Sequence, residues 1–376
     1  MADHHRLQTQ ALMEGVFDSY IALLPVMNDS SLLDNEDQRQ KIIANLENLK
    51  NSFDAAEHIA ALQTPSFMPS IETFGEHIDE TIRVVRTGNK NFAQMRMKAV
   101  TSLCMTCHTQ LPDGKSSLLV SKIAEMDRSK FASDYDYAEF LFLNRNYLRS
   151  VRYYERAIQT HLHNLANKIG SRDIAERELR RSFRRVLSIY TKVNYMPSVA
   201  RSFMEKFVEH RSLPGMLQVD MRHWIKSLRA WERRDLVIRM NSPESVNSFI
   251  EAYLVPLKRP SLSPDDRHEV TLLIASGVLT KFLAHRVDDE LEARALFWLA
   301  RAERQLNYQF FYSLSELYLR DCIKKYPKTS YAQMCLDEYR ESLIYGYSGS
   351  AGIDIPDDEQ EKLKELEEFL ERHRAR

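Results

Sequence analysis

The stretch Asn89–His108, NKNFAQMRMKAVTSLCMTCH, decides the fold and the chemistry that we expect of this chain. Apolar residues recur in it every three or four positions, which is the period of one face of an α-helix. The residues of that expected stripe are Phe92, Met95, Ala99, Leu103 and Cys107. The pattern predicts a helix that ends in the motif Cys104-Met105-Thr106-Cys107-His108.

Three earlier segments have the same period: Leu7–Met27, Glu36–Leu62 and Phe67–Val85. Their apolar stripes are Met13, Phe17, Tyr20 and Leu24 in the first, Ile42, Leu46, Leu49 and Phe53 in the second, and Ile71, Phe74, Ile78, Ile82 and Val85 in the third. Helices of about 20 residues joined by short connections are typical of an antiparallel bundle. Residues 1–112 are therefore predicted to form a four-helix bundle.

The composition favours helices along the whole chain, because only 10 Gly and 12 Pro occur in 376 residues and tight turns depend on both. This length suits two or three domains. The segment Leu111–Ser117 interrupts the helical period, so we place a linker at residues 113–118. No window reaches about 18 uninterrupted apolar residues, and no membrane span is expected.

Residues 119–345 are predicted to be a helical domain similar to a tetratricopeptide (TPR) solenoid. In Tyr137–Ala157 small and apolar residues stand where a TPR helix pair needs them: Ala138, Leu141, Tyr147, Ser150, Tyr154 and Ala157. The segment Tyr326–Ala332 resembles the boundary between successive repeats. Residues 170–290 show no clean 34-residue period, so an irregular helical bundle is the alternative.

Residues 346–376 are expected to form a flexible hinge and a C-terminal helix. The hinge follows from the Gly- and Ser-rich run 345–352. The helix, Asp357–His373, is highly charged and has one apolar edge made of Leu363, Leu366, Phe369 and Leu370. A solenoid needs a terminal cap, so we favour capping over the capture of a partner for this helix.

The motif of Cys104, Cys107 and His108 has the C-x-x-C-H form of a haem c attachment site. Two thiols three residues apart project from the same side of a helix, so both can add to the vinyl groups on one edge of a porphyrin. The adjacent His then supplies an axial iron ligand. A thioredoxin-like site would need a βαβ pattern, and a zinc site would need a second ligand pair nearby; neither is present in the sequence.

The position of the motif at the end of a fourth helix resembles the class II c-type cytochromes, the cytochrome c′ group. The segments Thr87–Ala93 and Gln10–Phe17 are similar to that family's turn into the fourth helix and to its haem-facing first helix. The resemblance implies one covalent haem c, with Cys104 and Cys107 as thioether anchors and His108 as the proximal ligand. The family often has a basic residue shortly after the His, whereas residues 109–112 here contain none.

The resemblance also implies that Met13 is the sixth iron ligand, because low-spin members use a first-helix Met. A filled sixth position favours electron transfer. The alternative is that Met13 is a core residue and that the distal site is open or blocked by Phe17, which would suit the binding of a small gas. His58 and His77 lie on predicted bundle helices, and we expect them at the surface.

These features predict an exported c-type cytochrome that serves electron transfer or redox relay rather than catalysis. Its TPR-like region would dock redox partner proteins; we expect no nucleic-acid partner. The alternatives are a haem-based gas or redox sensor and a TPR-like scaffold without haem. Haem c is attached outside the bacterial cytoplasm, so we expect a signal peptide that the first residues, Met1–His5, do not provide.

Charges and the remaining cysteines leave two questions open. The net charge is −1, but acidic side chains outnumber basic ones before about residue 115, and basic side chains outnumber acidic ones from about 145 to 240. This asymmetry suits solvated helix faces or the steering of a partner. Cys322 and Cys335 flank the turn Pro327–Ser330 at nearly equal distances, so a disulfide between them is an option, but we favour two reduced, buried thiols.

Overall fold

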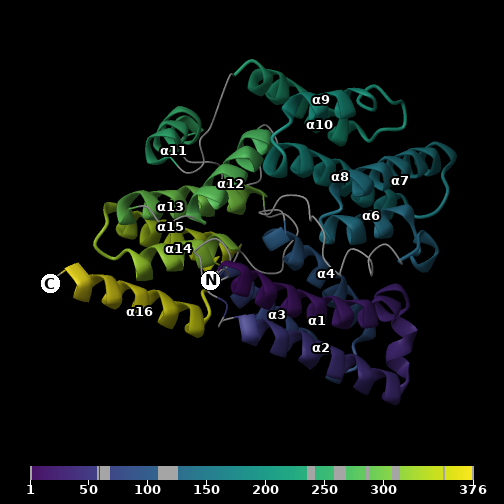
Figure 1. Cartoon of the computed structure of the whole chain (residues 1–376), viewed down its shortest axis with the longest axis horizontal. Coiled ribbons are helices and arrows are strands. Elements are labelled where there is room, and N and C mark those ends of the chain that lie inside the picture. Colours follow the sequence, from purple (N-terminus) through teal and green to yellow (C-terminus); the bar gives the residue numbers. More distant parts are fainter. Residues whose placement is uncertain are drawn as a thin grey trace. The chain divides into compact units, whose positions relative to one another are not determined.

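The computed structural model describes residues 2–56, 59, 68–108, 126–234, 242–257, 268–284, 288–306, 314–349 and 352–374. These residues contain 15 α-helices and one pair of two-residue strands, so the predicted all-α class is confirmed. None of the described helices is long and apolar enough to cross a membrane. The chain divides into two compact units, residues 1–222 and 223–376, and Figure 1 shows their helices.

The first unit begins with four helices whose contacts form a ring. Each packs on the next, and the first also contacts the fourth. The helices are α1 (Ala2–Asn28), α2 (Glu36–Ala56), α3 (Met68–Arg86) and α4 (Lys90–His108), with a 3-10 helix (Ser30–Asp34) between α1 and α2. The four predicted helices are thus present; the second was expected to continue to Leu62, and residues 57, 58 and 60–62 lie outside the described residues.

The apolar stripes expected for α2 and α3 are confirmed, because every residue assigned to them is buried. On α1, Phe17 and Tyr20 are buried, whereas Met13 and Leu24 are half-buried. Val16 and Leu23 join the buried face of α1 and widen it beyond the expected stripe. Burial of these apolar side chains is the main source of stability in this part of the unit.

The stripe expected for α4 is wrong at Met95; Phe92 and Ala99 are half-buried, and the side chains of Leu103 and Cys107 lie outside the described part of the structure. Met95 is 48% exposed, while Ala93, Met97 and Val100 are completely buried. Apolar residues stand on both sides of this helix, so the period alone does not tell which side faces the core. Packing of α3 and α1 against the side of Ala93, Met97 and Val100 decides it.

Further helices complete the first unit beyond the linker expected at residues 113–118, which lie outside the described residues. They pack in chain order from α6 to α8, and α4 contacts α6. They are α6 (Asp134–Leu143), α7 (Tyr147–Asn167), α8 (Arg172–Ser188), α9 (Pro197–Glu205) and α10 (Gly215–Glu232), with short helices at Arg128–Lys130 and Ile189–Val193; α10 ends in the second unit. The six small and apolar positions expected to be buried in Tyr137–Ala157 are buried.

Part of the basic stretch predicted around residues 145–240 is used inside the first unit. Arg185 forms a buried ion pair with Glu139, its Nε lying 3.1 Å from a carboxylate oxygen, and Tyr154 donates a hydrogen bond to the same carboxylate. Arg180 pairs with Asp220. These arginines connect α8 to its neighbours, so they are not available as a free basic face.

In the second unit, the consecutive helices α12 to α15 each pack on the next one. Helix α13 also contacts α15. The elements are α11 (Pro243–Phe249), short helices at Ile250–Leu254 and Val255–Leu257, α12 (Glu269–Leu283), α13 (Asp289–Leu306), α14 (Leu314–Lys325) and α15 (Ser330–Gly346).

Cys322 on α14 and Cys335 on α15 form a disulfide, with their Cα atoms 6.4 Å apart. Both residues are fully buried. The expectation of two reduced thiols is therefore wrong, because the packing of α14 on α15 brings the two cysteines level and they form the bridge. It closes a short loop around the turn between the two helices.

The last segment folds back on the second unit. Within the region expected to be a hinge, β1 (Ser348–Gly349) pairs antiparallel with β2 (Gly352–Ile353). The helix that follows, α16 (Asp357–Arg374), contacts α14 and α15. Leu366 and Leu370 are buried there, and Leu363 and Phe369 are half-buried. The apolar edge of α16 is thus partly covered.

Candidate functional site

The last two turns of α4 hold the C-x-x-C-H motif. Cys104 is half-buried and continues the buried side of α4, since it follows Val100 by four residues. Cys107 lies in the helix, but its side chain is outside the described part of the structure. His108 is the last residue of α4 and is half-buried.

The ring of His108 is anchored by the end of α6. Its Nδ1 forms a hydrogen bond with the backbone carbonyl of Leu143. A carbonyl oxygen can only accept, so Nδ1 carries the proton and the neutral ring presents the lone pair of Nε2. This is the arrangement found around metal-bound histidines, in which the second nitrogen is held by a carbonyl or carboxylate.

The carbonyl of Leu143 is available because of the way α6 ends. The last carbonyls of a helix have no partner within it. Those of Phe140, Leu141 and Phe142 accept bonds from the backbone N–H groups of residues 144, 146 and 145. Leu143 is left for His108, and the negative end of the α6 dipole favours the donor placed there.

The chain reverses sharply after Leu143, at Arg145, whose φ is +56°. A side chain other than Gly in this left-handed region is unusual and is held by its surroundings. The reversal starts α7, and the hydroxyl of Tyr147 donates to the backbone carbonyl of His108 at 2.8 Å. The pair α6–α7 therefore holds both the ring and the backbone of His108.

The protein around the His108 ring lowers its pKa to about 4, because removal from water disfavours the charged form; the positive charge of Arg145 acts in the same direction. The bond to Leu143 opposes this shift. At neutral pH the imidazole is uncharged, which is the form that binds iron.

The two residues assigned to the distal side occupy α1. Phe17 is buried, and its ring centroid lies 6.3 Å from that of Phe140 on α6. Phe17 therefore packs against the same helix that anchors His108. Met13 lies one turn earlier and is half-buried. Its assignment as sixth ligand stays a prediction.

His77 was expected at the surface, and this expectation is wrong. It is fully buried between α3 and α4, where its Nε2 donates to the carbonyl of Arg96 at 2.8 Å. Arg96 in turn donates to the carbonyl of His77 at 3.1 Å and to Thr81 at 3.3 Å. Burial lowers the pKa of His77 to about 4. His58 lies outside the described residues.

These residues fit a haem c group in the part of the site that is described. His108 presents Nε2 as a donor with its other nitrogen fixed, and Cys104 lies one turn before it on the same helix. Within the described ranges no cluster of three or more His, Cys, Asp or Glu could hold a metal ion by itself. The described part of the motif offers one imidazole and one thiol, and covalent attachment of haem c would need Cys107 as the second thiol.

Leu143 and Tyr147 hold His108, and the sequence did not reveal these two contacts. The role of Leu143 belongs to its backbone and has no signature in the side chain. Tyr147 stands at a position expected to be buried in a helix pair, which suggested packing but not a bond to His108. Comparison with protein-family models, curated proteins and solved structures gives no match, so the chemistry of the site rests on its own residues.

Proposed function

We propose that this protein is an exported c-type cytochrome that carries one haem c on Cys104 and Cys107, with His108 as an axial ligand, and transfers electrons. The observation that carries the proposal is the bond between His108 Nδ1 and the carbonyl of Leu143. It leaves Nε2 as the coordinating atom at the end of a C-x-x-C-H helix. When bound, haem supplies a one-electron carrier whose potential depends on its axial ligands and surroundings.

The helices α1 to α4 support this proposal as a four-helix bundle similar to class II cytochromes. Their contacts run α1–α2, α2–α3, α3–α4 and α4–α1. A ring of four helices can enclose a planar group between its side chains. In this chain the pair α6–α7 would add a support for the proximal His that lies outside the four helices.

The later helices would serve as a TPR-like scaffold for docking redox partner proteins. A helix that packs on both its next neighbour and the one after, as α13 does with α14 and α15, is the contact pattern of stacked helical pairs. The disulfide of Cys322 and Cys335 supports an exported protein, because such bonds persist in oxidising compartments.

Haem attachment is tested by producing an exported form together with the haem c maturation machinery. The purified protein is denatured, extracted with acid acetone and stained for haem peroxidase activity. Colour that stays with the polypeptide supports the proposal. Colour that leaves with the solvent, or no colour after maturation of a control cytochrome in the same cells, contradicts it.

The sixth ligand separates a carrier from a sensor. With Met13 bound, the iron would be six-coordinate, low-spin and slow to bind CO, and Met13→Ala would accelerate CO binding. Leu24→Ala, at another half-buried position of α1, is the matched control and should leave the CO rate unchanged. A wild-type spectrum that is already high-spin, with rapid CO uptake, would favour a gas sensor.

A further inference from the structure

The C-terminal turn of α6, which presents the Leu143 carbonyl to His108, also carries a buried charge. Glu139 lies about one turn before Leu143 and is 8% exposed. A carboxylate so far from water needs partners, because an unpaired buried charge is costly. Its partners come from α7 and α8, so three helices meet at this carboxylate.

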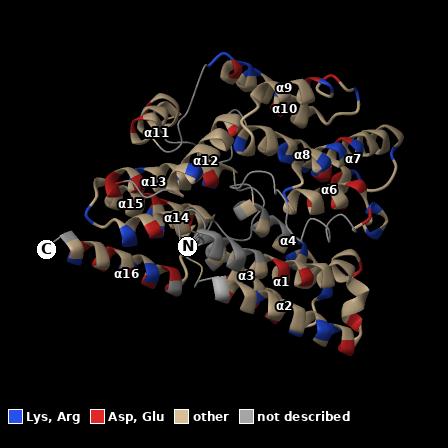
Figure 2. Cartoon of the chain, viewed as in Figure 1, with Lys and Arg blue, Asp and Glu red and all other residues tan. Residues whose placement is uncertain are grey.

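Arg185 of α8 holds the carboxylate with two nitrogens. Its Nε lies 3.1 Å from one oxygen of Glu139 and its Nη2 lies 3.3 Å from the other, while Tyr154 of α7 also donates to this carboxylate. The side chains of Arg185 and Glu139 are only 14% and 11% exposed. Figure 2 shows the basic positions of α8 and the acidic positions of α6. A planar guanidinium that binds a carboxylate at two points fixes direction as well as distance.

The same guanidinium also contacts a second residue of the C-terminal turn of α6. Its Cζ lies 5.1 Å from the centre of the Phe142 ring, which is a cation–π contact. The Phe142 ring packs edge-to-face on that of Tyr147, with 5.5 Å between the ring centres, and Tyr147 donates to the backbone carbonyl of His108. A continuous series of contacts therefore joins Arg185 to His108 through the end of α6.

The carboxyl group of Glu139 is ionised. Burial by itself raises the pKa of Glu139, but the positive charges of Arg185 and Arg181 outweigh it and hold the pKa below its usual value. Arg181 also donates to the hydroxyl of Tyr135, in the first turn of α6, at 3.3 Å. Glu139 is therefore a carboxylate at neutral pH, and both of its oxygens accept hydrogen bonds from Arg185.

A buried ion pair contributes little to stability compared with apolar residues of the same size, because both charges have lost their water. Its contacts are directional, however, and they fix the groups that they join. The group that holds the second nitrogen of a metal-bound histidine sets the orientation of the ring and its strength as a donor. Contacts that fix the Leu143 carbonyl therefore act on His108.

We propose that Arg185 and Glu139 are positioning residues for the haem ligand His108. They hold the C-terminal turn of α6 so that the Leu143 carbonyl accepts from Nδ1 and Nε2 remains the coordinating atom. The inference rests on the proposed function, because it concerns the axial ligand. It extends that function to two residues of α6 and α8, which lie outside the four-helix bundle.

The first test needs no haem. The full chain is produced without haem maturation and with isotope-labelled histidine, and NMR measures the exchange rate of the His108 Nδ1 proton with water. In Arg185→Lys the positive charge is kept, but lysine has neither the two-point fork nor the flat face that lies on Phe142. We expect exchange to be about tenfold faster, the factor that corresponds to the loss of about one hydrogen bond.

His77 is an internal reference for this measurement. It lies in the same unit, is fully buried and donates from Nε2 to the carbonyl of Arg96 at 2.8 Å. A positioning role accelerates exchange at His108 and leaves His77 within about twofold, whereas general loosening of the unit accelerates both.

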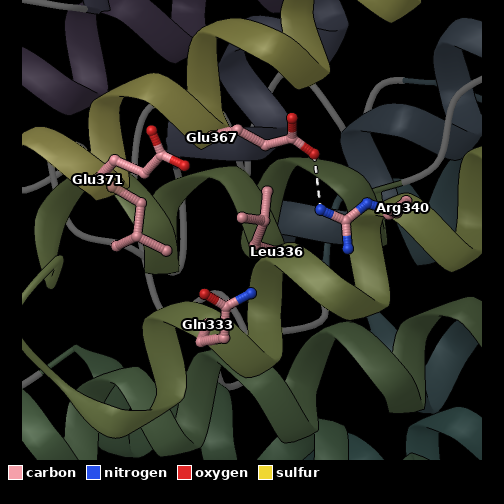
Figure 3. Close-up of a pocket in the computed structure, with 6 residues that line it drawn as sticks. Gln333, Leu336, Arg340, Glu367 and Glu371 are labelled. Atoms are coloured by element: carbon pink, nitrogen blue, oxygen red, sulfur yellow. Dashed lines mark hydrogen bonds and ion pairs between the residues drawn. The ribbon is translucent and has the colours of Figure 1, made fainter.

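Arg340→Lys is the matched control. It makes the same substitution in the ion pair of Arg340 and Glu367, which joins α15 to α16 at 2.6 Å in the second unit (Figure 3). This change removes a similar two-helix contact that has no link to the end of α6. The exchange rates of His108 and His77 should both stay as in the wild type.

Glu139→Gln is the second variant. It keeps the size of the side chain and an acceptor oxygen for Tyr154, but it removes the charge that pairs with Arg185, and it should accelerate the His108 proton selectively. Unchanged exchange at His108 in both variants would overturn the proposal, and so would equal acceleration at His108 and His77. If circular dichroism shows that one variant does not fold, the other decides. Unfolding of both would assign the pair to the fold itself and also overturn the proposal.

The reduction potential of the haem-loaded chain is a further readout. A hydrogen bond from Nδ1 to a carbonyl makes the imidazole a stronger donor, which favours ferric iron. Arg185→Lys should therefore raise the potential, and Arg340→Lys should leave it unchanged; an equal or lower potential in Arg185→Lys contradicts the proposal. If haem does not attach, the proposed function fails, while the exchange measurement still decides whether the pair positions His108. The two failures are thus distinguishable.

Discussion

The two pairs of cysteines in this chain have opposite geometries. Cys104 and Cys107 are three residues apart on one helix, α4, which is slightly less than one helical turn. Cys322 and Cys335 are 13 residues apart on two helices and are joined to each other inside the second unit. Helix geometry sets the first pair, and packing of two helices sets the second.

The comparison teaches that spacing has a different meaning in each pair. Residues three apart in a helix lie on the same side, which makes them suited to a shared external group and poorly placed for a bond to each other without distortion of the helix. Residues in facing helices come close only when the turn between them places them level. The first pair therefore suggests a ligand, and the second acts as a covalent connection.

The largest expected effect is the loss of covalent haem when the first pair of cysteines, but not the second, is replaced. The double variant Cys104→Ala, Cys107→Ala should lose all covalent haem, because both thioether bonds are removed. Cys322→Ala, Cys335→Ala is the matched control and should retain the haem stain. Equal staining of both double variants, measured on denaturing gels after maturation, would contradict the assignment of the motif.

Reduction of the second pair should lower the stability of the second unit by about 3 kcal/mol, because the bridge closes a short loop in the unfolded chain. All three tryptophans, Trp224, Trp231 and Trp298, lie in this unit, so tryptophan fluorescence during urea unfolding reports on it. Cys322→Ala, Cys335→Ala should unfold at the same urea concentration with and without reductant. A wild-type midpoint that does not respond to reductant would show that the bridge contributes little.

The free energy of unfolding of the first unit should depend on pH, because of His77, and not on the presence of a reductant. Its folded pKa of about 4 lies below the usual 6.5, so the unfolded chain takes up the proton first as pH falls. The neutral His77 ring makes its full contribution to the free energy of unfolding above pH 6.5. That contribution decreases between pH 6.5 and pH 4, and about 2 kcal/mol of it is lost at pH 5. Because His77 is fully buried, solvent screening reduces this effect little.

The measurement for His77 is the difference in unfolding free energy between the wild type and His77→Gln at several pH values. Other titrating groups, including His108, cancel in that difference. Circular dichroism reports on both units. Tryptophan fluorescence gives the unfolding transition of the second unit, and the remaining circular dichroism change is assigned to the first unit. A difference that stays constant from pH 7 to pH 5 would exclude His77 as the source.

The smallest effect concerns the support of His108. Tyr147→Phe removes the hydroxyl that donates to the His108 carbonyl and should destabilise the first unit by about 1 kcal/mol. Tyr153→Phe, a half-buried tyrosine on the same helix, is the control and should change stability by less than about 0.5 kcal/mol. Equal losses in the two variants would assign no special role to the Tyr147 bond.

The sequence alone was sufficient for the helices and for the reactive motif. The 3.6-residue period located α1 to α4, although α1 begins at Ala2 rather than at the expected Leu7, because each helix buries one continuous apolar side. The motif of Cys104, Cys107 and His108 is local, so its residues and their spacing are visible without any structure. The charged C-terminal helix was also evident, from Leu366 and Leu370 on one edge.

Only the tertiary structure decided which side of α4 faces the core, since apolar residues stand on both sides and neighbouring helices choose between them. It also buried His77, joined Cys322 to Cys335 and placed the Leu143 carbonyl at His108. These outcomes share one cause. Each depends on two segments that are at least 13 residues apart in the sequence and meet only after the helices pack. No local period or motif therefore predicts them.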